Sequence, residues 1–110
     1  MTEAGCPFCN YSGPSKILGE TDDAYVIKPI DPVTYGHVLV IPKRHVETAT
    51  EDPETTALAF LRAAEWMDGS DEDFNLIQSN GPAATQTVKH LHVHIVPRKE
   101  GDGLSLPWTP

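Results

Sequence analysis

The chain of 110 residues has few basic side chains and no long apolar run. Lys and Arg total 8 against 16 Asp and Glu, which gives a formal net charge of −8 at pH 7. General nucleic-acid binders are normally basic, so this balance argues against a nucleic-acid partner. No stretch approaches the roughly 20 apolar residues that a membrane-spanning helix needs, so we expect no membrane partner either. The length predicts a single domain over residues 1–110.

Cysteine is scarce, and its placement is informative. The N-terminus lacks a basic region followed by an apolar one, so the sequence predicts no secretory signal and a cytoplasmic location. Because thiols in the cytoplasm are kept reduced, we do not expect a structural disulfide between Cys6 and Cys9, the two cysteines of "CPFC". The pair is typical of half a metal site or of a redox motif. Redox pairs normally precede a helix, and no helical pattern follows Cys9, which favours metal.

The apolar pattern predicts an antiparallel α+β domain with about five strands and one main helix. The expected strands cover residues 16–20, 24–30, 37–42, 74–80 and 89–97. We expect the helix to cover one face of the sheet. The other face is then solvated or buried by a partner.

The helix has clear start and stop signals. Asp52 is a suitable N-cap, Pro53 fits the first helical position, and Gly69 ends the helix. Helical spacing predicts one buried stripe, made of Ala57, Phe60, Leu61, Ala64 and Met67.

Three histidines alternate in "KHLHVHIVPR", residues 89–98. Alternate side chains of a strand share a face, so His90, His92 and His94 are predicted to project together, opposite an apolar row. Two interpretations compete at this point. Alternating histidines can chelate zinc, and neutral imidazoles can do acid–base and nucleophilic work on a phosphorus centre.

The segment upstream of the histidines favours phosphorus chemistry. "SNGPAATQTVK" offers a Gly-containing turn, the amide of Gln86, the hydroxyl of Thr87 and the cation of Lys89, a set that suits phosphate oxygens. A catalytic metal would usually need carboxylates or histidines plus a general base, and no Asp or Glu lies between Phe74 and Arg98. The basic residues that flank the histidine-bearing segments suggest a locally basic site for a small anion; they are Lys43, Arg44, Lys89, Arg98 and Lys99.

Two blocks, "GHVLVIPKRH" (36–45) and "NGPAATQTVKHLHVHIVPRKEGD" (80–102), resemble the histidine triad (HIT) family of nucleotide hydrolases and transferases. The second block is similar in particular to the fragile-histidine-triad branch, which cleaves dinucleoside polyphosphates. The similarity runs from about Ala24 onward. It implies a HIT-like fold, an adenosine nucleotide substrate, and a homodimer in which two sheets join into one.

The resemblance also implies roles for individual residues. His92 is expected to attack the α-phosphorus and form a nucleotidyl-histidine that water then splits, with its tautomer held by the backbone carbonyl of His90. His94 is expected to hydrogen-bond the phosphate and the leaving group. Mg²⁺ is not needed for the attack and is expected only as a companion of a polyphosphate. Substrate contacts are expected from Asn80, Gln86, Thr87 and His94.

Some bacterial members of the family resemble this chain in carrying a structural Zn²⁺ set. By that resemblance the zinc ligands are Cys6, Cys9, His45 and His90. Residues 1–16 then form a zinc-knuckle-like N-terminal segment, and residues 101–110 form a C-terminal tail. His37 is expected to support the site as a hydrogen-bonded residue without a chemical role.

The chain departs from the family pattern at Pro29, where relatives usually carry an Asp or Asn that contacts ribose. Either Lys28 or Asp31 takes over, or ribose is held less specifically. The tail "LPWTP" resembles the nucleoside phosphoramidase branch, whose tryptophan approaches the active site, as Trp108 could here. Three alternatives therefore stay open: a Hint-like phosphoramidase, a nucleotide-binding sensor or adaptor with little turnover, and a zinc hydrolase with the histidine row as catalytic ligands.

Overall fold

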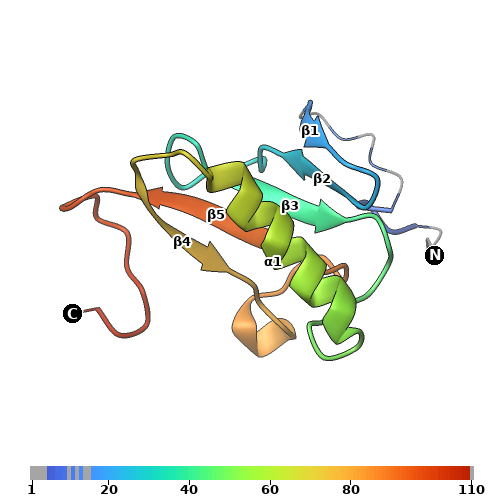
Figure 1. The fold of residues 1–110 in the computed structure, drawn as a ribbon. Coiled ribbons are helices and arrows are strands. Elements are labelled where there is room, and N and C mark those ends of the chain that lie inside the picture. Colours follow the sequence, from blue (N-terminus) through green and yellow to red (C-terminus); the bar gives the residue numbers. More distant parts are fainter. Residues whose placement is uncertain (1–4, 10, 12, 14–15, 110) are drawn as a thin grey trace.

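The computed structural model describes residues 5–9, 11, 13 and 16–109. Its elements are β1 (Ile17–Glu20), β2 (Ala24–Ile27), β3 (Val38–Pro42), α1 (Pro53–Met67), β4 (Asp73–Ile77), the short 3₁₀ helix η1 (Pro82–Ala84) and β5 (Val93–Arg98). The strands form one sheet in the order β1-β2-β3-β5-β4, and every neighbouring pair is antiparallel. Helix α1 lies across one face of this sheet (Figure 1). The predicted α+β architecture is confirmed, although η1 was expected to be plain loop.

Helix α1 starts and stops where the sequence indicates. Asp52 precedes it with an extended backbone, and Pro53 occupies the first turn, where a missing N–H costs nothing. After the last helical residue the chain reverses at Gly69, whose φ of +84° is cheap only for glycine. In the part of the chain that the structure describes, no helix is long and apolar enough to cross a membrane.

The predicted buried stripe of α1 was partly wrong. Met67 is buried and Phe60 is partly buried, as expected, but Leu61 is 49% exposed and Ala57 and Ala64 also face outward. The residues that face the sheet are Thr55, Ala59, Ala63 and Met67. Three of these four side chains are small, so the helix packs closely on β3 and β5 over most of its length. Apolar periodicity alone could not show this, because Leu61 and alanines satisfy several helical phases equally well.

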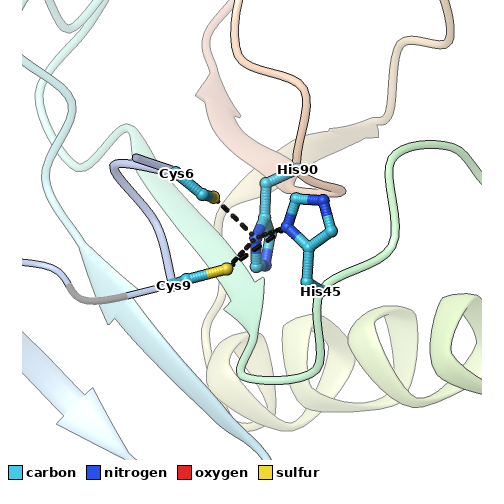
Figure 2. A group of neighbouring side chains, drawn as sticks. All are labelled: Cys6, Cys9, His45 and His90. Carbon is cyan, nitrogen blue, oxygen red and sulfur yellow. Dashed lines mark hydrogen bonds between the residues drawn. The ribbon is translucent and has the colours of Figure 1, made fainter. Parts of the chain in front are cut away.

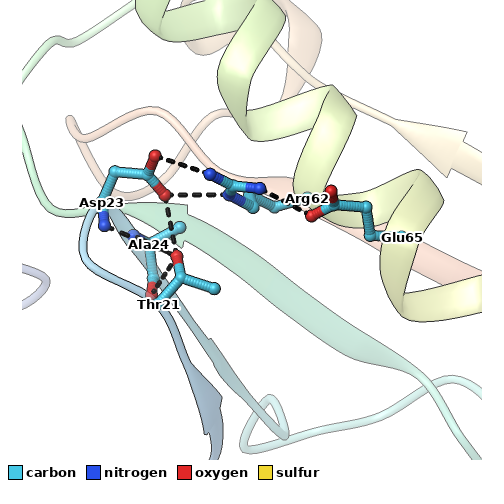
Figure 3. A network of polar contacts seen from close by, with 5 residues as sticks. All are labelled: Thr21, Asp23, Ala24, Arg62 and Glu65. Carbon is cyan, nitrogen blue, oxygen red and sulfur yellow. Dashed lines mark hydrogen bonds and ion pairs between the residues drawn. The ribbon is translucent and has the colours of Figure 1, made fainter.

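A charged network fixes α1 to the turn between β1 and β2 (Figure 3). The guanidinium of Arg62 donates to both carboxylate oxygens of Asp23 at 2.9 Å each and to Glu65 at 2.7 Å. Thr21 adds a hydroxyl bond to the same carboxylate at 2.7 Å. These bonds lower the pKa of Asp23 to about 2, with the Arg62 contact the largest cause. Such two-pronged geometry is stronger than an ordinary surface ion pair.

The sheet has a core on each face. The helix-side core includes Val26, Val40, Ala59, Leu91, Val93 and Ile95. The opposite core comprises Phe8, Tyr25, Ile27, Leu39 and Ile41, with Cys6, Tyr11 and Val88 packed against it. The expectation that this second face is solvated or covered by a partner was therefore incomplete. The N-terminal segment of the same chain folds back over part of it.

The last strand begins later than predicted, at Val93, so His90 and His92 lie in the segment that leads into it. The alternation nevertheless holds, because Leu91 and Val93 are fully buried in the helix-side core. His94 pairs in register with Leu39, a member of the opposite core. The histidine row therefore lies on the face that α1 leaves open.

Candidate active site

His92 has one ring nitrogen held and the other available. Its Nδ1 lies 2.8 Å from the carbonyl oxygen of His90. A carbonyl can only accept, so Nδ1 carries the proton and Nε2 keeps its lone pair. Burial lowers the pKa of His92 below its ordinary value, so the ring is neutral at pH 7. A neutral imidazole with a free Nε2 has the form that a nitrogen nucleophile requires.

The tautomer of His94 is set by a chain of hydrogen bonds. The backbone N–H of Val33 donates to Nδ1 of His37 at 3.0 Å, so the proton of that ring is on Nε2. His37 Nε2 lies 3.0 Å from Nδ1 of His94 and donates to it. The remaining proton of a neutral His94 is therefore on Nε2. Burial, with His92 and His37 nearby, lowers the pKa of His94 to about 4, and burial lowers the pKa of His37 as well.

The two rings thus have complementary functions. His92 presents a lone pair, and His94 presents an N–H donor, with ring centroids 5.2 Å apart. His37, expected only as support, proves to be the residue that fixes the donor form of His94. This arrangement suits attack on an electrophile that carries a departing, negatively charged group.

Two cavities are lined by residues that belong to the row or contact it. The first, of about 460 Å³, is largely apolar and is lined by Pro7, Phe8, Tyr11, Gly13, Ile27, Lys28, Pro29, Ile30, Leu39 and Val88. The second has a volume of about 290 Å³ and is lined by His37 and His94 themselves. Its other lining residues are polar (Ser79, Thr85, Arg98 and Ser105) or apolar (Val33, Ile77, Val96, Leu104 and Leu106). Both are large enough for part of a small molecule, and His94 pairs with Leu39, a residue that lines the first cavity.

The predicted zinc ligands converge on one point (Figure 2). Cys6 Sγ lies 3.3 Å from His90 Nδ1, Cys9 Sγ lies 3.2 Å from His45 Nδ1, and the two Nδ1 atoms are 3.2 Å apart. A tetrahedral zinc ion with Zn–S near 2.3 Å and Zn–N near 2.0–2.1 Å separates its ligand atoms by about 3.3–3.8 Å. The three observed spacings are close to the lower end of that range, and all four ligand atoms lie within 4.8 Å of one another, so these four residues could hold a metal.

The hydrogen bonds of His90 identify its ligand atom. Its Nε2 donates to the carbonyl oxygen of Pro42 at 2.7 Å, which leaves Nδ1 with a lone pair aimed at the cluster. His90 is fully buried, and burial lowers its pKa, so the ring is neutral as a metal ligand must be. His92 and His94 are not members of this group. The geometry does not support a metal site built from the whole row.

Three of the four predicted substrate-binding residues lie on the loop before the row, namely Asn80, Gln86 and Thr87, and the fourth, His94, belongs to the row. The amide oxygen of Asn80 accepts the backbone N–H of Ala49 at 2.7 Å, and the amide nitrogen of Gln86 donates to the carbonyl of Glu47 at 2.7 Å. Both amides therefore shape the loop in this structure, while Thr87 is exposed. The loop also contains the positive φ of Thr85, +69°, a strained value for a β-branched residue.

The predicted basic character of the site is weaker than expected. Three of the five flanking cations pair with carboxylates: Lys43 with Glu20 at 2.6 Å, Arg44 with Asp52 at 3.3 Å, and Arg98 with Asp102 at 2.8 Å. Their charge is largely neutralised locally. Glu20 lies on β1 and Lys43 directly follows β3, a pairing that the spacing of Lys and Arg along the chain does not reveal, whereas Asp102 lies only four residues after Arg98.

Phe8 is the residue that the sequence interpretation missed. Its ring meets His92 edge to face, with centroids 5.3 Å apart and planes at 82°, and it meets His90 in the same manner at 6.0 Å. One signal could have found it. Phe8 lies between Cys6 and Cys9, and a peptide between two ligands of one metal must lie against that site.

Comparison with known proteins identifies the family. The family model of the HIT domain matches residues 11–101. The chain belongs to the histidine triad family. An adenosine 5′-monophosphoramidase of Saccharomyces cerevisiae is 35% identical to it, over 96% of this chain and 71% of that protein.

Solved HIT structures support the fold. A protein from Streptococcus mutans superposes with a TM-score of 0.86 at 34% identity, covering 99% of this chain and 75% of that one. A zinc-bound histidine triad protein from Mycobacterium smegmatis gives a TM-score of 0.75 at 34% identity, covering 91% of this chain and 77% of that one.

Proposed function

We propose that this HIT protein hydrolyses adenosine nucleotides at the α-phosphate, acting on AMP conjugates or dinucleoside polyphosphates through a nucleotidyl-histidine at His92. The observation that supports this most is the tautomer pair: a free Nε2 lone pair on His92 and an Nε2–H on His94. The phosphoramidase activity of the yeast relative points to the same substrate class.

The reaction has two displacements. In the first, His92 Nε2 forms a bond to the α-phosphorus, and the bond from phosphorus to the leaving oxygen or nitrogen breaks. The leaving group takes the electron pair while His94 Nε2–H donates to it, which lowers the charge it must carry. In the second, a water oxygen bonds to phosphorus, the N–P bond breaks with its electron pair returning to His92 Nε2, and the proton that the water loses passes through solvent to the departed group, so that AMP and free His92 result. Asn80, Gln86 and Thr87 are proposed to hold phosphate oxygens after their loop adjusts.

We propose a structural role for the metal, with Zn²⁺ held by Cys6, Cys9, His45 and His90, because the spacing fits a closed tetrahedral site. The attack needs no divalent cation, and Mg²⁺ is proposed only as a companion of a polyphosphate. Thiolate ligands persist in a reducing compartment, which is consistent with a cytoplasmic protein.

The test compares wild type with His92→Ala and His92→Gly. AMP release from an adenosine phosphoramidate and from diadenosine triphosphate is followed by chromatography. We expect both variants to lose several powers of ten in rate, as enzymes do when the nucleophile is removed. If His92→Ala turns over substrate as fast as wild type, His92 is not the nucleophile.

A second substrate distinguishes a variant that lacks only the nucleophile from a variant that has failed to fold. Adenosine 5′-phosphorimidazolide already contains the N–P bond of the proposed intermediate, so His92→Gly is expected to hydrolyse it by using the space left by the ring. A His92→Gly protein that binds AMP but leaves the imidazolide intact contradicts the second displacement.

One observation favours a second function, that of a nucleotide-binding sensor with little turnover. The described residues that line the larger cavity include Lys28 and Pro29 but no carboxylate to hold ribose hydroxyls. Tight AMP binding without product from either substrate supports this alternative.

We also propose a homodimer. Strand β4 is an edge strand, and Phe74 on it is 38% exposed. Leu61 on α1 is also exposed, at 49%. Pairing of two β4 edges would join the sheets of two copies. Sedimentation equilibrium distinguishes the 12.0 kDa chain from its dimer.

A further inference from the structure

The metal cluster is connected to His92 by two separate routes. The first runs through His90, which contributes to both places. Its Nδ1 lies in the cluster, and its carbonyl oxygen accepts the Nδ1–H of His92 at 2.8 Å. A third contact, from Nε2 to the carbonyl of Pro42 at 2.7 Å, fixes the ring of His90 to β3. A metal that holds His90 therefore also holds the acceptor that sets the tautomer of His92.

The second route runs through Phe8, in the short peptide between Cys6 and Cys9. Phe8 is only 8% exposed, and its ring edge lies against the ring of His92 at a centroid distance of 5.3 Å. Its carbonyl accepts a hydrogen bond from the Tyr25 hydroxyl. Burial, together with Cys6 and Cys9, raises the pKa of Tyr25, so this hydroxyl stays a donor. Edge-to-face packing of this kind restricts the rotation of both rings.

The same peptide forms one wall of the larger cavity. Pro7, Phe8 and Tyr11 line it from the N-terminal segment, and Ile27 and Leu39 line it from the sheet. In the metal cluster, Cys6 and Cys9 of this segment lie close to His45, which follows β3, and to His90, which precedes β5 (Figure 2). The contacts between the cysteines and these histidines join the wall of the cavity to the body of the domain.

We propose that the metal cluster is the device that positions the nucleophile, and that Phe8 is the positioning residue that transmits its effect to His92. Metal occupancy then controls both the orientation of His92 and the apolar wall against which the nucleobase packs. This inference rests on the proposed function for the role of His92. It extends the role of the metal from holding the fold to preparing the site.

The experiment uses zinc-loaded protein and compares Phe8→Leu and Phe8→Ala with wild type. Leu keeps apolar volume and removes the ring edge, whereas Ala removes both. Phe60→Leu is the matched control, since Phe60 is another aromatic packed against a core, partly buried on the helix side of the sheet. The readouts are bound zinc, kcat and KM for the phosphoramidate, the AMP dissociation constant by calorimetry, and the ¹⁵N signals of His92.

We expect Phe8→Leu to keep its zinc and to lose about 10- to 100-fold in kcat, because misplacing a reacting group by about 1 Å can cost about 10²-fold. Its His92 signals are expected to show a mixture of tautomers. Phe8→Ala is also expected to raise the AMP dissociation constant about fivefold or more, as loss of an aromatic contact with a base does. Phe60→Leu is expected to match wild type in all these readouts. Removing zinc from wild type is expected to weaken AMP binding and to broaden the His92 signals.

The proposal is overturned if Phe8→Leu has the same kcat, AMP affinity and His92 signals as wild type. It is also overturned by a zinc-free protein that binds AMP normally with unchanged His92 signals, because the metal is then purely structural. If circular dichroism shows that zinc removal unfolds the whole chain, the zinc-free protein cannot test the proposal. The zinc-loaded Phe8 variants then decide whether Phe8 positions His92. If His92→Ala stays active, the proposed function fails, but AMP affinity and the His92 signals still decide whether the cluster positions this ring.

Discussion

The hydrogen bond between His37 and His94 makes a quantitative prediction for His37→Leu. In wild type, Val33 N–H fixes His37 with its proton on Nε2, and the 3.0 Å contact to His94 Nδ1 leaves the proton of His94 on Nε2. Leucine has no donor. His94 is then free to adopt the other tautomer, in which a lone pair faces the leaving group.

The expected loss follows from the hydrogen bond that is removed. A neutral hydrogen bond contributes about 0.5–1.5 kcal/mol net. At about 1.4 kcal/mol per factor of ten, kcat for the phosphoramidate is expected to fall about 2- to 12-fold. Removing His37 also removes a neighbouring imidazole that lowers the pKa of His94, so that pKa is expected to rise above about 4.

Steady-state kinetics and ¹⁵N signals of the imidazoles test this prediction together. His37→Gln is the matched variant, because its amide N–H can still donate to His94 Nδ1 and is expected to retain more activity than leucine. An unchanged kcat in His37→Leu, with His94 still protonated only on Nε2, refutes the assignment of the tautomer to His37.

Two further predictions concern the proposed nucleophile His92 and the packing of helix α1 on the sheet. Because burial lowers the pKa of His92 below 6.5, its inactive protonated form builds up only in acid; kcat/KM is expected to stay level through pH 7 and to fall with a midpoint below 6.5. A midpoint above 6.5 in the pH–rate profile contradicts this. Ala63 is fully buried against the sheet, so Ala63→Leu is expected to lower the free energy of unfolding by about 1–3 kcal/mol, whereas Ala57→Leu on the exposed face is expected to change it by less than about 0.5 kcal/mol. Equal urea-denaturation midpoints for Ala63→Leu and Ala57→Leu would show that the buried and exposed faces of α1 are wrongly assigned.

Local signals were sufficient for the elements of the fold. Pro53 and Gly69 set the ends of α1 through backbone dihedrals that depend only on the residues themselves. The two-residue alternation around His92 separated a buried apolar row from a histidine row, even though β5 starts only at Val93. The types of ligand in "CPFC" and in the histidine segments also indicated a metal before any coordinates.

The phase of α1 and the charge of the site were not available locally. Leu61 and Ala63 are both acceptable on a helix, and the contact with β3 and β5 decides which of them is buried. Lys43 looked like a cation for a small anion, yet Glu20, on β1, accepts its ammonium group at 2.6 Å. A competing partner of this kind becomes visible only when the side chains have positions.

The sequence by itself determined the strands, the helix and the chemical types of the site residues, because these depend on neighbours along the chain. Tertiary structure decided how those residues act. Cys6 and His90 are 84 positions apart, and only the pairing of β3 with β5 and the return of the N-terminal segment bring them within 3.3 Å. The same packing places Phe8 on His92 and His37 on His94, so the tautomer of His94 is set by a residue 57 positions away, whereas that of His92 is set by the backbone carbonyl two residues before it.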